Sequence, residues 1–347
     1  MHDQRAFKAR IDDVLHDFVG QEARQLTAIS ADLAPVADQL RSTMADGKRL
    51  RAAFCYLGWL SAGQPDSDAA IKAAAAMELV HAAAVVHDDI IDDSSTRRGV
   101  ATAHIALRSA IGNREWRQNG AIGLAILVGN LLLSWAGQLF TSCGLPRAFL
   151  ARALPLWSQL ARELVAGECL EIMRTGDPHH TERSLEIIRF KTAKYTVERP
   201  LHIGATLGGA PLKRLRALTS YGLPMGEAFQ LHDDLLGVFG DSLRTGKSNL
   251  DDLSGNKPTA LMAVTLAAAH GTDRIELLRR LGRRDLADSD LRTIREIMDR
   301  VGARAAVESM IEERAASARS AIDVAGLPAV AADGLLRLTS AVITRDR

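Results

Sequence analysis

The sequence has few cysteines and no excess of charge of either sign. Only three cysteines occur among 347 residues, and none of them belongs to a CxxC pair. This indicates neither a disulfide framework nor a zinc site, and it favours a reducing, cytosolic compartment. The 43 Lys and Arg balance the 42 Asp and Glu, for a net charge of +1. We therefore expect no nucleic-acid partner, and any anionic ligand needs a local basic cluster.

Signals for a leader, for strands and for repeats are lacking as well. Residues 1–18 mix both charge signs with scattered apolar residues, so we expect no signal peptide and no cleavage there. No window keeps the alternating Val, Ile and Thr pattern of strands for long, and no fixed-period repeat occurs. Ala, Leu, Arg and Glu dominate instead, and Gly and Pro clusters separate about ten segments. The sequence predicts one all-α domain over residues 1–347.

The longest stretch without a charged residue runs over residues 118–146. Its length approaches that of a membrane-spanning helix. Asn130, Ser134 and Gln138 recur at four-residue spacing, and this polar seam suits a neighbouring helix better than lipid. We therefore expect a helix that is buried on all sides, and no transmembrane segment.

The first group of chemistry-bearing residues lies in HAAAVVHDDIIDDSSTRRG, residues 81–99. Asp88 and Asp92 are four residues apart, so a helix presents both carboxylates on one face, with Asp89 beside them. Like charges at this spacing destabilise a helix, and a cation should lie among them. Mg²⁺ fits because it prefers carboxylate oxygens and shares its shell with phosphate. The alternative is a solvated acidic helix end.

A second group follows the same design in residues 226–247. Asp233 and Asp234 lie at the end of an apolar-rich helical stretch. Each acidic group is followed by cations, which are Arg97, Arg98 and Lys247. A diphosphate bridged by Mg²⁺ requires acid beside base, because the metal neutralises some phosphate oxygens while Arg or Lys donates to others. The alternative is a pair of unrelated surface salt-bridge clusters.

Two basic segments indicate a second anion. In residues 47–51, GKRLR, three basic residues follow Gly47 at an expected helix start, where backbone N–H groups also favour anions. Residues 189–196, RFKTAKYT, add a second basic run, which a solvated charge run explains equally well. The side chains concerned are Lys48, Arg49, Arg51, Lys191, Thr192 and Lys194.

Taken in order, these motifs resemble those of the all-trans polyprenyl diphosphate synthases over residues 47–259. GKRLR resembles the family's GGKRLRP, HDDIID with RRG resembles its first aspartate-rich region, and Lys191-Thr192 resembles its KT motif. FQLHDD, TGK and DLSGNKPT resemble the second region and its tail. The resemblance implies one large isoprenoid synthase-like helical bundle around a central cavity. It also implies head-to-tail condensation of isopentenyl diphosphate with an allylic diphosphate, with three Mg²⁺ ions.

The resemblance also implies a role for each matching residue. The implied Mg²⁺ ligands, on two facing walls, are Asp88, Asp89, Asp92, Asp233 and Asp234. The groups around the allylic diphosphate and the reaction centre are Arg97, Lys191, Thr192, Gln230 and Lys247. The groups for isopentenyl diphosphate are Lys48, Arg51, His81 and Arg98, and Lys257 of the tail is a further substrate-binding residue.

The sequence departs from the family pattern at several positions. Gly237 stands where the second region most often has its last carboxylate, so one expected metal ligand is missing. We expect Asp233 and Asp234 to retain the metals with added water. Glu168 replaces a usual Gln, and Ser254, Gly255 and Asn256 replace the tail's Arg, Glu and Gly.

The product length should depend on the helix that carries Asp88. The residues four and five positions before it are Ala84 and Ala83, so no aromatic side chain closes a tunnel there. We expect a product longer than a farnesyl chain, geranylgeranyl diphosphate first, with Met77 as part of the stop. Substituting Ala83→Phe should then shorten the product. Ordinary helix packing of the two alanines is the alternative.

Two other functions compete with chain elongation. A class I terpene cyclase also uses DDxxD on an all-α fold, but it pairs it with an Asn/Ser/Glu metal motif that this sequence lacks. A non-catalytic or weakly active partner subunit of another synthase is favoured by Gly237 and by the altered tail. The family resemblance and the apolar helix expected at residues 120–137 imply a homodimer.

Overall fold

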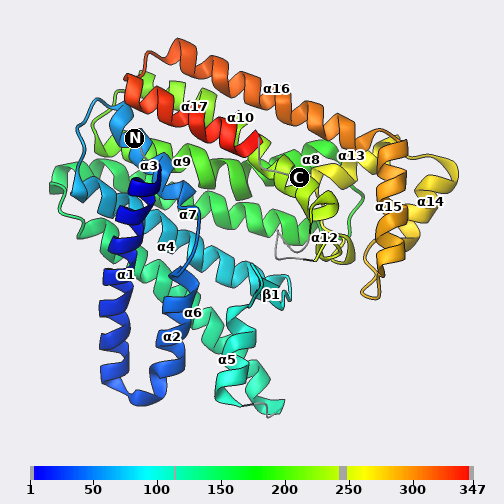
Figure 1. Cartoon of the computed structure of the whole chain (residues 1–347), viewed down its shortest axis with the longest axis horizontal. Helices are drawn as coiled ribbons and strands as arrows, with labels where there is room; N and C mark the ends of the chain where they lie inside the picture. Colours follow the sequence, from blue (N-terminus) through cyan, green and yellow to red (C-terminus); the bar gives the residue numbers. More distant parts are fainter. Residues whose placement is uncertain (1–3, 113–114, 242–247, 344–347) are drawn as a thin grey trace. The chain divides into compact units, whose positions relative to one another are not determined.

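Helices form nearly all of the regular structure. The computed structural model describes residues 4–112, 115–241 and 248–343, and the all-α prediction is confirmed there (Figure 1). The contacts within the chain divide it into two compact units. Unit 1 comprises Met1–Ala153 and Ile203–Gly209, and unit 2 comprises Leu154–His202 and Ala210–Arg347. The single domain over residues 1–347 and the central cavity stay predictions.

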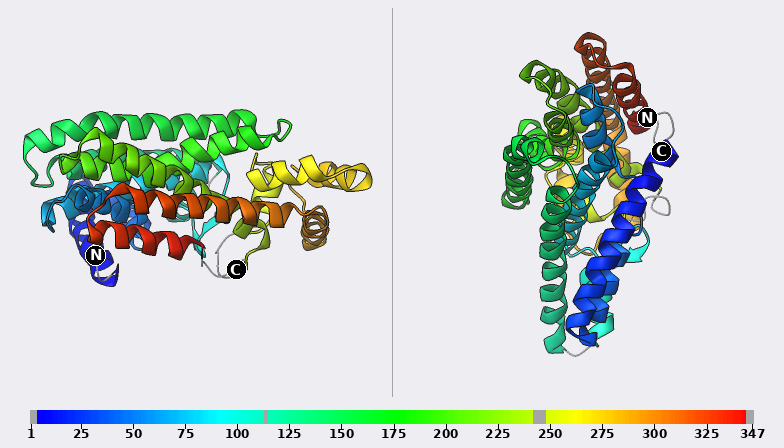
Figure 2. Two further views of the ribbon diagram at one scale, coloured as in Figure 1. Left: turned by 90° about the horizontal axis from the view of Figure 1, so that it is seen from above. Right: turned by 90° about the vertical axis from the view of Figure 1, so that its left-hand side faces the viewer.

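Unit 1 is built around one buried helix. Its elements are α1 (Gln4–Ile29), η1 (Ala31–Leu33), α2 (Ala34–Met44), α3 (Leu50–Ser61), α4 (Asp68–Ile91), β1 (Thr96–Arg97), β2 (Val100–Ala101), α5 (Ala103–Ile111) and α6 (Glu115–Thr141). Helix α4 begins where the Ser67 side chain accepts the N–H of Ala70. It is rich in Ala, Val and Ile and packs against α3 and α6. Figure 2 shows α1 and α2, both blue, side by side.

Helix α6 is buried on one side only, so the prediction of burial on all sides is wrong. Gly129 faces α4, where a Cβ would lie 2.2 Å from Nε2 of His87. Ile126, Leu127 and Leu133 are 41%, 59% and 44% exposed. The predicted polar seam also lies on the exposed side. Of that seam, Gln138 donates a hydrogen bond to Glu22 of α1 at 2.9 Å.

Two helices pass a test of length and hydropathy for crossing a membrane. They are Asp68–Ile91, of which 72% of the apolar window is buried inside the protein, and Asn119–Thr141, of which 39% is buried. Core helices of soluble proteins pass the same test. Helix α4 is such a core helix, because its apolar side chains pack within unit 1.

A two-residue hairpin after α4 was not predicted. Strands β1 and β2 pair antiparallel, with Arg97 opposite Val100, so Arg98 and Gly99 form the turn. Their φ angles are 53° and 77°, as a type I′ turn requires at both central positions. Glycine adopts this conformation readily, whereas an arginine does so at a cost. The hairpin reverses the chain directly after the aspartates.

Unit 2 begins in the course of α7 (Arg147–Arg174). Its further elements are α8 (Thr181–Ile187), η2 (Ile188–Glu198), the first four residues of α9 (Arg199–Leu207), α10 (Leu212–Phe239), α12 (Asp251–Ser254), α13 (Ala260–Ala268), α14 (Gly271–Arg280), α15 (Asp288–Arg300), α16 (Ala303–Ala325) and α17 (Ala329–Ile343). The central helix α10 packs against α16 and η2, and α16 and α17 run side by side (Figure 1). The element η2 is a π-helix.

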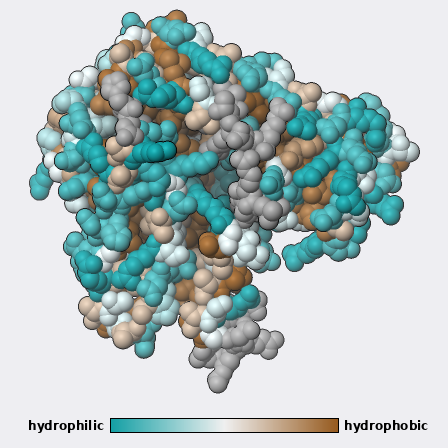
Figure 3. Space-filling model, viewed as in Figure 1, coloured by the Kyte–Doolittle hydropathy of each residue, from teal (hydrophilic) through white to brown (hydrophobic). Residues whose placement is uncertain are grey.

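The surface over α14 and α15 is mainly hydrophilic, as the right side of Figure 3 shows. Ile275 and Leu278 of α14 are exposed among these polar residues. Scattered apolar side chains of this kind are ordinary on a protein surface. They indicate no interaction site.

Candidate active site

The three aspartates of the first motif lie together at the end of α4, and we call them the first aspartate cluster. Asp89 is buried at 3% exposure, and Asp92 is the last residue to continue the helix. The next residue, Asp93, has a φ of 53°, and this left-handed backbone ends α4. The spacing of the sequence is therefore realised as one acidic helix end.

Arg97 holds two of these carboxylates in a fork. Its Nε donates to Oδ1 of Asp89 at 2.6 Å, and its Nη2 donates to Oδ2 of Asp88 at 2.9 Å. Burial tends to lower the pKa of Arg97, but the carboxylates of Asp89 and Asp88 raise it overall. The hairpin produces this contact because it turns β1 back toward α4. Within unit 1, acid and base therefore lie side by side.

The basic residues of unit 1 divide into a structural arginine and a cluster near His81. Arg49 is 4% exposed, and it donates to Oδ1 of Asp12 at 2.7 Å and to the carbonyl oxygen of Met44 at 2.7 Å. Arg49 is therefore held by contacts inside unit 1. The N–H of Ala52 in the first turn of α3 donates to Glu78, so this helix start is already partly satisfied.

His81 lies among arginines. Burial lowers its pKa well below the ordinary value, and the positive charges of Arg51, Arg98, Arg97 and Arg49 lower it further. Nη1 of Arg98 donates to the carbonyl oxygen of Asp46 at 3.2 Å, which brings the hairpin to the segment before α3. Lys48 is exposed in that same segment. The structure thus brings the four residues assigned to isopentenyl diphosphate into one part of unit 1.

The second aspartate cluster, Asp233 and Asp234, lies in the last third of α10. Asp234 is 6% exposed. Its Oδ1 accepts a hydrogen bond from Nε2 of Gln230 at 2.9 Å, and its Oδ2 accepts from the N–H of Ala260 at 3.3 Å. Burial raises the pKa of Asp234 to about 8, with a smaller contribution from Asp252. This carboxyl therefore retains its proton at neutral pH in the metal-free protein.

A chain of hydrogen bonds joins the KT motif to the second aspartate cluster. Oγ1 of Thr192 donates to Oε1 of Gln230 at 2.7 Å, and the amide of Gln230 continues to Asp234. Three predicted residues from two separate motifs thus meet in unit 2. Lys247 lies outside the described residues.

Lys191 lies between two carboxylates of α7 that the sequence analysis did not assign to it. Its Nζ is 2.6 Å from Oε1 of Glu171 and 2.9 Å from Oε2 of Glu168. The two glutamates are three residues apart, so they share one face of α7. That spacing is the signal that could have found them, but only the fold shows which lysine they contact. Glu168, where the family usually has Gln, adds a negative charge beside Lys191.

Asp252 of the tail lies beside Gly237. A Cβ at Gly237 would lie 3.0 Å from Oδ2 of Asp252, so the Asp252 carboxylate occupies space beside the missing side chain. Nζ of Lys257 is 3.8 Å from Oδ1 of Asp252. Asp252 is a residue that the sequence analysis missed, because nothing local connects α12 with α10.

The three residues assigned to chain length differ in exposure. Ala83 is 0% exposed and Met77 is 1% exposed, so both pack inside unit 1. Ala84 keeps part of its surface exposed. Of the two alanines, only Ala84 is therefore open to a ligand, whereas a larger side chain at Ala83 would strain the packing.

The donor set suits a hard cation that is shared with a substrate. Among the described residues, no group of three or more His, Cys, Asp or Glu side chains is arranged to hold a metal alone. Both aspartate clusters offer carboxylate oxygens, which Mg²⁺ prefers, and Mg²⁺ is commonly held by one or two carboxylates plus substrate phosphates. The residues present fit Mg²⁺ in this shared form.

Comparison with known proteins agrees with these features. The model of the polyprenyl synthetase family matches residues 34–298. The octaprenyl diphosphate synthase of Escherichia coli (strain K12) is 30% identical over 336 residues, which cover 95% of this chain and 96% of that protein. The (2E,6E)-farnesyl diphosphate synthase of Mycobacterium bovis is 32% identical over 264 residues, with 74% and 68% covered.

Solved structures are similar over almost the whole chain. Geranylgeranyl pyrophosphate synthase from Corynebacterium glutamicum, complexed with isoprenyl diphosphate and magnesium, has a TM-score of 0.93 and 32% identity, with 99% of each chain covered. Polyprenyl synthase from Caulobacter crescentus, complexed with calcium and isoprenyl diphosphate, has a TM-score of 0.82 and 28% identity, covering 99% of this chain and 96% of that one.

Proposed function

The chain belongs to the polyprenyl synthetase family and is a trans-prenyl diphosphate synthase, and from this premise we propose that it condenses isopentenyl diphosphate with an allylic diphosphate. The proposal rests on the hydrogen bonds that connect residues of the motifs within each unit. Unit 1 pairs the first aspartate cluster with Arg97, and unit 2 links Thr192 through Gln230 to Asp234. One diphosphate would have to engage both clusters.

We propose that Mg²⁺ is held by Asp88, Asp89, Asp92, Asp233 and Asp234. When bound, it supplies the positive charge that stabilises a departing diphosphate. The fit rests on the carboxylate oxygens of the two clusters, with Asp252 beside the place of Gly237. The names of the Corynebacterium and Caulobacter structures, with magnesium and calcium, support a divalent cation.

The cationic side chains would bind the two diphosphates. In this proposal Arg97 and Lys191 leave their carboxylate partners for the oxygens of the allylic diphosphate, where charge develops as its C–O bond breaks. Arg51, Arg98 and Lys48 hold isopentenyl diphosphate, and neutral His81 donates without adding charge. Holding both substrates replaces an encounter of two molecules by a reaction within one complex.

The carbon chemistry needs no protein nucleophile. The allylic C–O bond breaks heterolytically, and the diphosphate takes the electron pair. The double bond of isopentenyl diphosphate attacks the cation, and a proton then leaves the product for the released diphosphate. Thr192 and Gln230 orient polar atoms at the reaction centre through their 2.7 Å hydrogen bond. Apolar surroundings exclude water that would quench the cation.

We propose geranylgeranyl diphosphate or a longer chain as the product. The relatives carry octaprenyl, farnesyl and geranylgeranyl names, so their names do not fix the length. The argument rests on the small side chain of Ala84, which is partly exposed four residues before Asp88. Substituting Ala84→Phe should shorten the product. Because Ala83 is fully buried, Ala83→Phe should instead lower stability, and Ala84→Ser is the matched control for length.

The test of the proposed function is a primer-and-product assay. Purified protein is incubated with Mg²⁺, labelled isopentenyl diphosphate and allylic primers of increasing length, and the dephosphorylated products are separated by chromatography. Growth of the primer supports the proposal. A cyclic hydrocarbon would indicate a terpene cyclase, and no conversion would indicate a partner subunit.

We also propose a homodimer in a reducing, cytosolic compartment. Ile126, Leu127 and Leu133 give α6 an exposed apolar side, which a second copy of α6 would cover. Cys55, Cys143 and Cys169 are all free thiols, as such a compartment maintains. Light scattering of the purified protein tests the dimer.

A further inference from the structure

The KT motif lies in an unusual element. The π-helix η2 runs over 11 residues, Ile188–Glu198, and carries Lys191 and Thr192 in its first half. Hydrogen bonds to the fifth residue along make this helix wider than an α-helix, and π-turns are rare and frequent at functional sites. A π-helix of this length requires contacts that exclude the ordinary α-helical register.

Two glycines let neighbouring helices approach the backbone of η2. A Cβ at Gly167 of α7 would lie 2.3 Å from the backbone nitrogen of Lys191. A Cβ at Gly226 of α10 would lie 2.4 Å from Cα of Ala193. Both distances are far shorter than any real contact of a side chain. These close approaches leave room for the wide helix, but they do not fix its register, because glycine offers no directional group.

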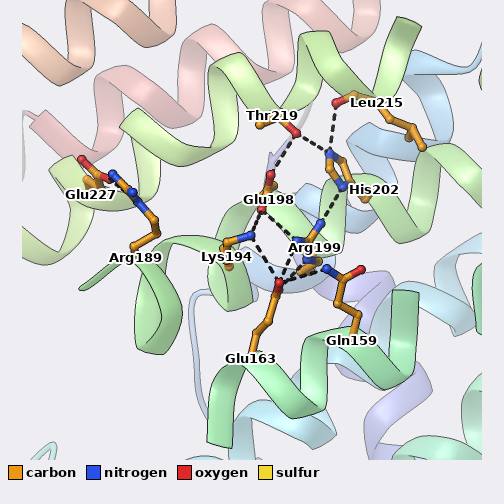
Figure 4. Close-up of polar contacts among 10 residues, drawn as sticks. All are labelled: Gln159, Glu163, Arg189, Lys194, Glu198, Arg199, His202, Leu215, Thr219 and Glu227. Carbon is orange, nitrogen blue, oxygen red and sulfur yellow. Dashed lines mark hydrogen bonds and ion pairs between the residues drawn. The ribbon is translucent and has the colours of Figure 1, made fainter. Parts of the chain in front are cut away.

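The directional contacts come from a charged network at the C-terminal end of η2, drawn in Figure 4. Arg199 makes a fork to Glu163 of α7, with Nε donating to Oε2 at 2.6 Å and Nη2 to Oε1 at 2.9 Å. Nζ of Lys194 is 3.3 Å from Oε1 of the same glutamate. Burial tends to raise the pKa of Glu163, but the hydrogen bonds from Arg199 hold it below its ordinary value.

Three further residues of unit 2 close the network, and they are Glu198, His202 and Thr219. Nδ1 of His202 accepts from Arg199 at 3.0 Å, and Nε2 donates to the carbonyl oxygen of Leu215 at 3.0 Å, so these partners assign a neutral ring. Oγ1 of Thr219 donates to Oε1 of Glu198 at 2.9 Å. With two acids, two bases and neutral His202, the charges balance. The π-helix network is Glu163, Lys194, Glu198, Arg199, His202 and Thr219.

The other end of η2 has a smaller clamp. Nη2 of Arg189 is 3.2 Å from Oε1 of Glu227, and Nε of Arg314 is 2.8 Å from Oε2 of the same residue (Figure 4 draws the first contact). Lys191 and Thr192 therefore lie between a clamp to α10 and the network to α7. The arginine of η2 in this clamp is half exposed, whereas Arg199 of the network is buried.

We propose that the π-helix network positions Lys191 and Thr192 for the ionisation step, with Glu163 as its central positioning residue. The inference rests on the proposed function of that site. Lys194 and Arg199 are five residues apart, so Glu163 contacts both only if the helix between them keeps its π register. A return to α-helical hydrogen bonding would rotate Thr192 away from Gln230 and Lys191 away from Glu171.

A double-mutant cycle tests this role. In Glu163→Gln, kcat should fall about 30-fold while KM for both substrates changes less than about threefold, because misplaced catalytic groups affect the transition state. Thr192→Val alone should lower kcat by a similar factor. In the double variant kcat should stay within about threefold of Thr192→Val, since both changes remove the same placement. The shifts in Tm should add, because the two side chains are not in contact.

A matched control comes from another ion pair of unit 2. Asp290 accepts from Nε of Arg280 at 3.1 Å, at similar exposure and on the separate helices α14 and α15. Asp290→Asn should lower Tm without changing kcat by more than about twofold. If Glu163→Gln does not fold, Thr219→Val replaces it in the cycle, because it removes one hydrogen bond at the edge of the network.

Two results would overturn the proposal. The first is a double variant whose loss of kcat equals the product of the two single losses. A Glu163→Gln variant with a lower Tm but an unchanged kcat would count in the same way. The second is unchanged hydrogen exchange of the amides of residues 188–198 in Glu163→Gln, because a lost register must open them. Hydrogen exchange does not depend on turnover. It therefore tests the inference even if the wild type shows no activity in the primer assay and the proposed function is wrong.

Discussion

The two aspartate clusters have similar sequences but different surroundings. Arg97 holds the first cluster from outside the helix, with contacts of 2.6 Å and 2.9 Å to Asp89 and Asp88. In the second cluster, the two hydrogen-bond partners of Asp234 are neutral. Asp234 is instead bound by the neutral amide of Gln230 and the N–H of Ala260, and burial raises its pKa to about 8.

Similar aspartate motifs are therefore found in two charge states in this protein. A guanidinium compensates the buried negative charge of the first cluster, whereas a proton removes the charge of Asp234. A cation that enters the first cluster competes with Arg97, and a cation that enters the second competes with a proton. The two clusters should therefore respond differently to the removal of an arginine and to pH.

The largest effect should come from deleting one carboxylate of either cluster. Asp88→Asn and Asp233→Asn should each lower kcat by about 10³-fold, because both clusters are proposed to serve one diphosphate. Steady-state assays with labelled isopentenyl diphosphate measure this. Asp93→Asn is the control, since asparagine tolerates the left-handed backbone of that position and should leave kcat within about twofold. If Asp233→Asn left kcat unchanged while Asp88→Asn lowered it, the two clusters would not both serve the reaction.

Removing the guanidinium of Arg97 should leave the negative charge of the first cluster without a compensating cation. In metal-free buffer Arg97→Ala should lower the free energy of unfolding by about 3 kcal/mol, because Asp89 remains buried without its partner. Arg98→Ala is the control and should lose only about 1 kcal/mol, since Arg98 donates to a backbone carbonyl. Denaturant unfolding compares them, and Mg²⁺ with diphosphate should restore most of the loss in Arg97→Ala. Equal losses would contradict the account.

The proton that Asp234 binds in the folded protein should affect how stability depends on pH. The folded pKa of Asp234 is about 8, and an unfolded aspartate has a pKa of about 3.9. Between these values the folded protein binds a proton that the unfolded chain has lost, so stability present at low pH is lost as pH rises through about 8. The slope contributed is about 1.4 kcal/mol per pH unit. Asp234→Asn should remove this slope in metal-free unfolding curves, and an unchanged slope would contradict it.

The smallest effect should come from restoring the missing carboxylate. Gly237→Asp places a side chain 3.0 Å from Oδ2 of Asp252, so two like charges meet. We expect the Mg²⁺ concentration for half-maximal rate to rise about threefold instead of falling. Adding Asp252→Asn should remove the repulsion and bring the value back to that of the wild type or below. If Gly237→Asp alone lowered the Mg²⁺ concentration for half-maximal rate, Asp252 would not be taking the place of the missing carboxylate.

Local patterns predicted most of the fold. Helices follow from propensity and from breaks at Gly and Pro, and the four-residue spacing of Asp88 and Asp92 fixes their common face. The hairpin was missed because an arginine occupies the first position of its turn, where Gly or Asn is usual. The exposed side of α6 was missed because periodicity identifies an apolar helix without saying which sides have neighbours.

The remaining site residues depend on tertiary contacts. Glu171, Asp252 and Glu163 are ordinary acids in the sequence, and only the fold places them beside Lys191, Gly237 and Arg199. The sequence also could not separate Lys48 from Arg49. The left-handed φ of 54° at Arg49 directs its side chain toward Asp12 and Met44. Backbone conformation, which composition does not reveal, thus decides where the side chain of Arg49 lies.

Binding stoichiometry of an allylic thiolodiphosphate, an unreactive substrate analogue, tests the central claim most directly. Isothermal titration calorimetry with Mg²⁺ should give one analogue per chain for the wild type, and Asp88→Asn or Asp233→Asn should each abolish Mg²⁺-dependent binding. A variant of either cluster that still binds one analogue with unchanged affinity would contradict a diphosphate shared by both clusters.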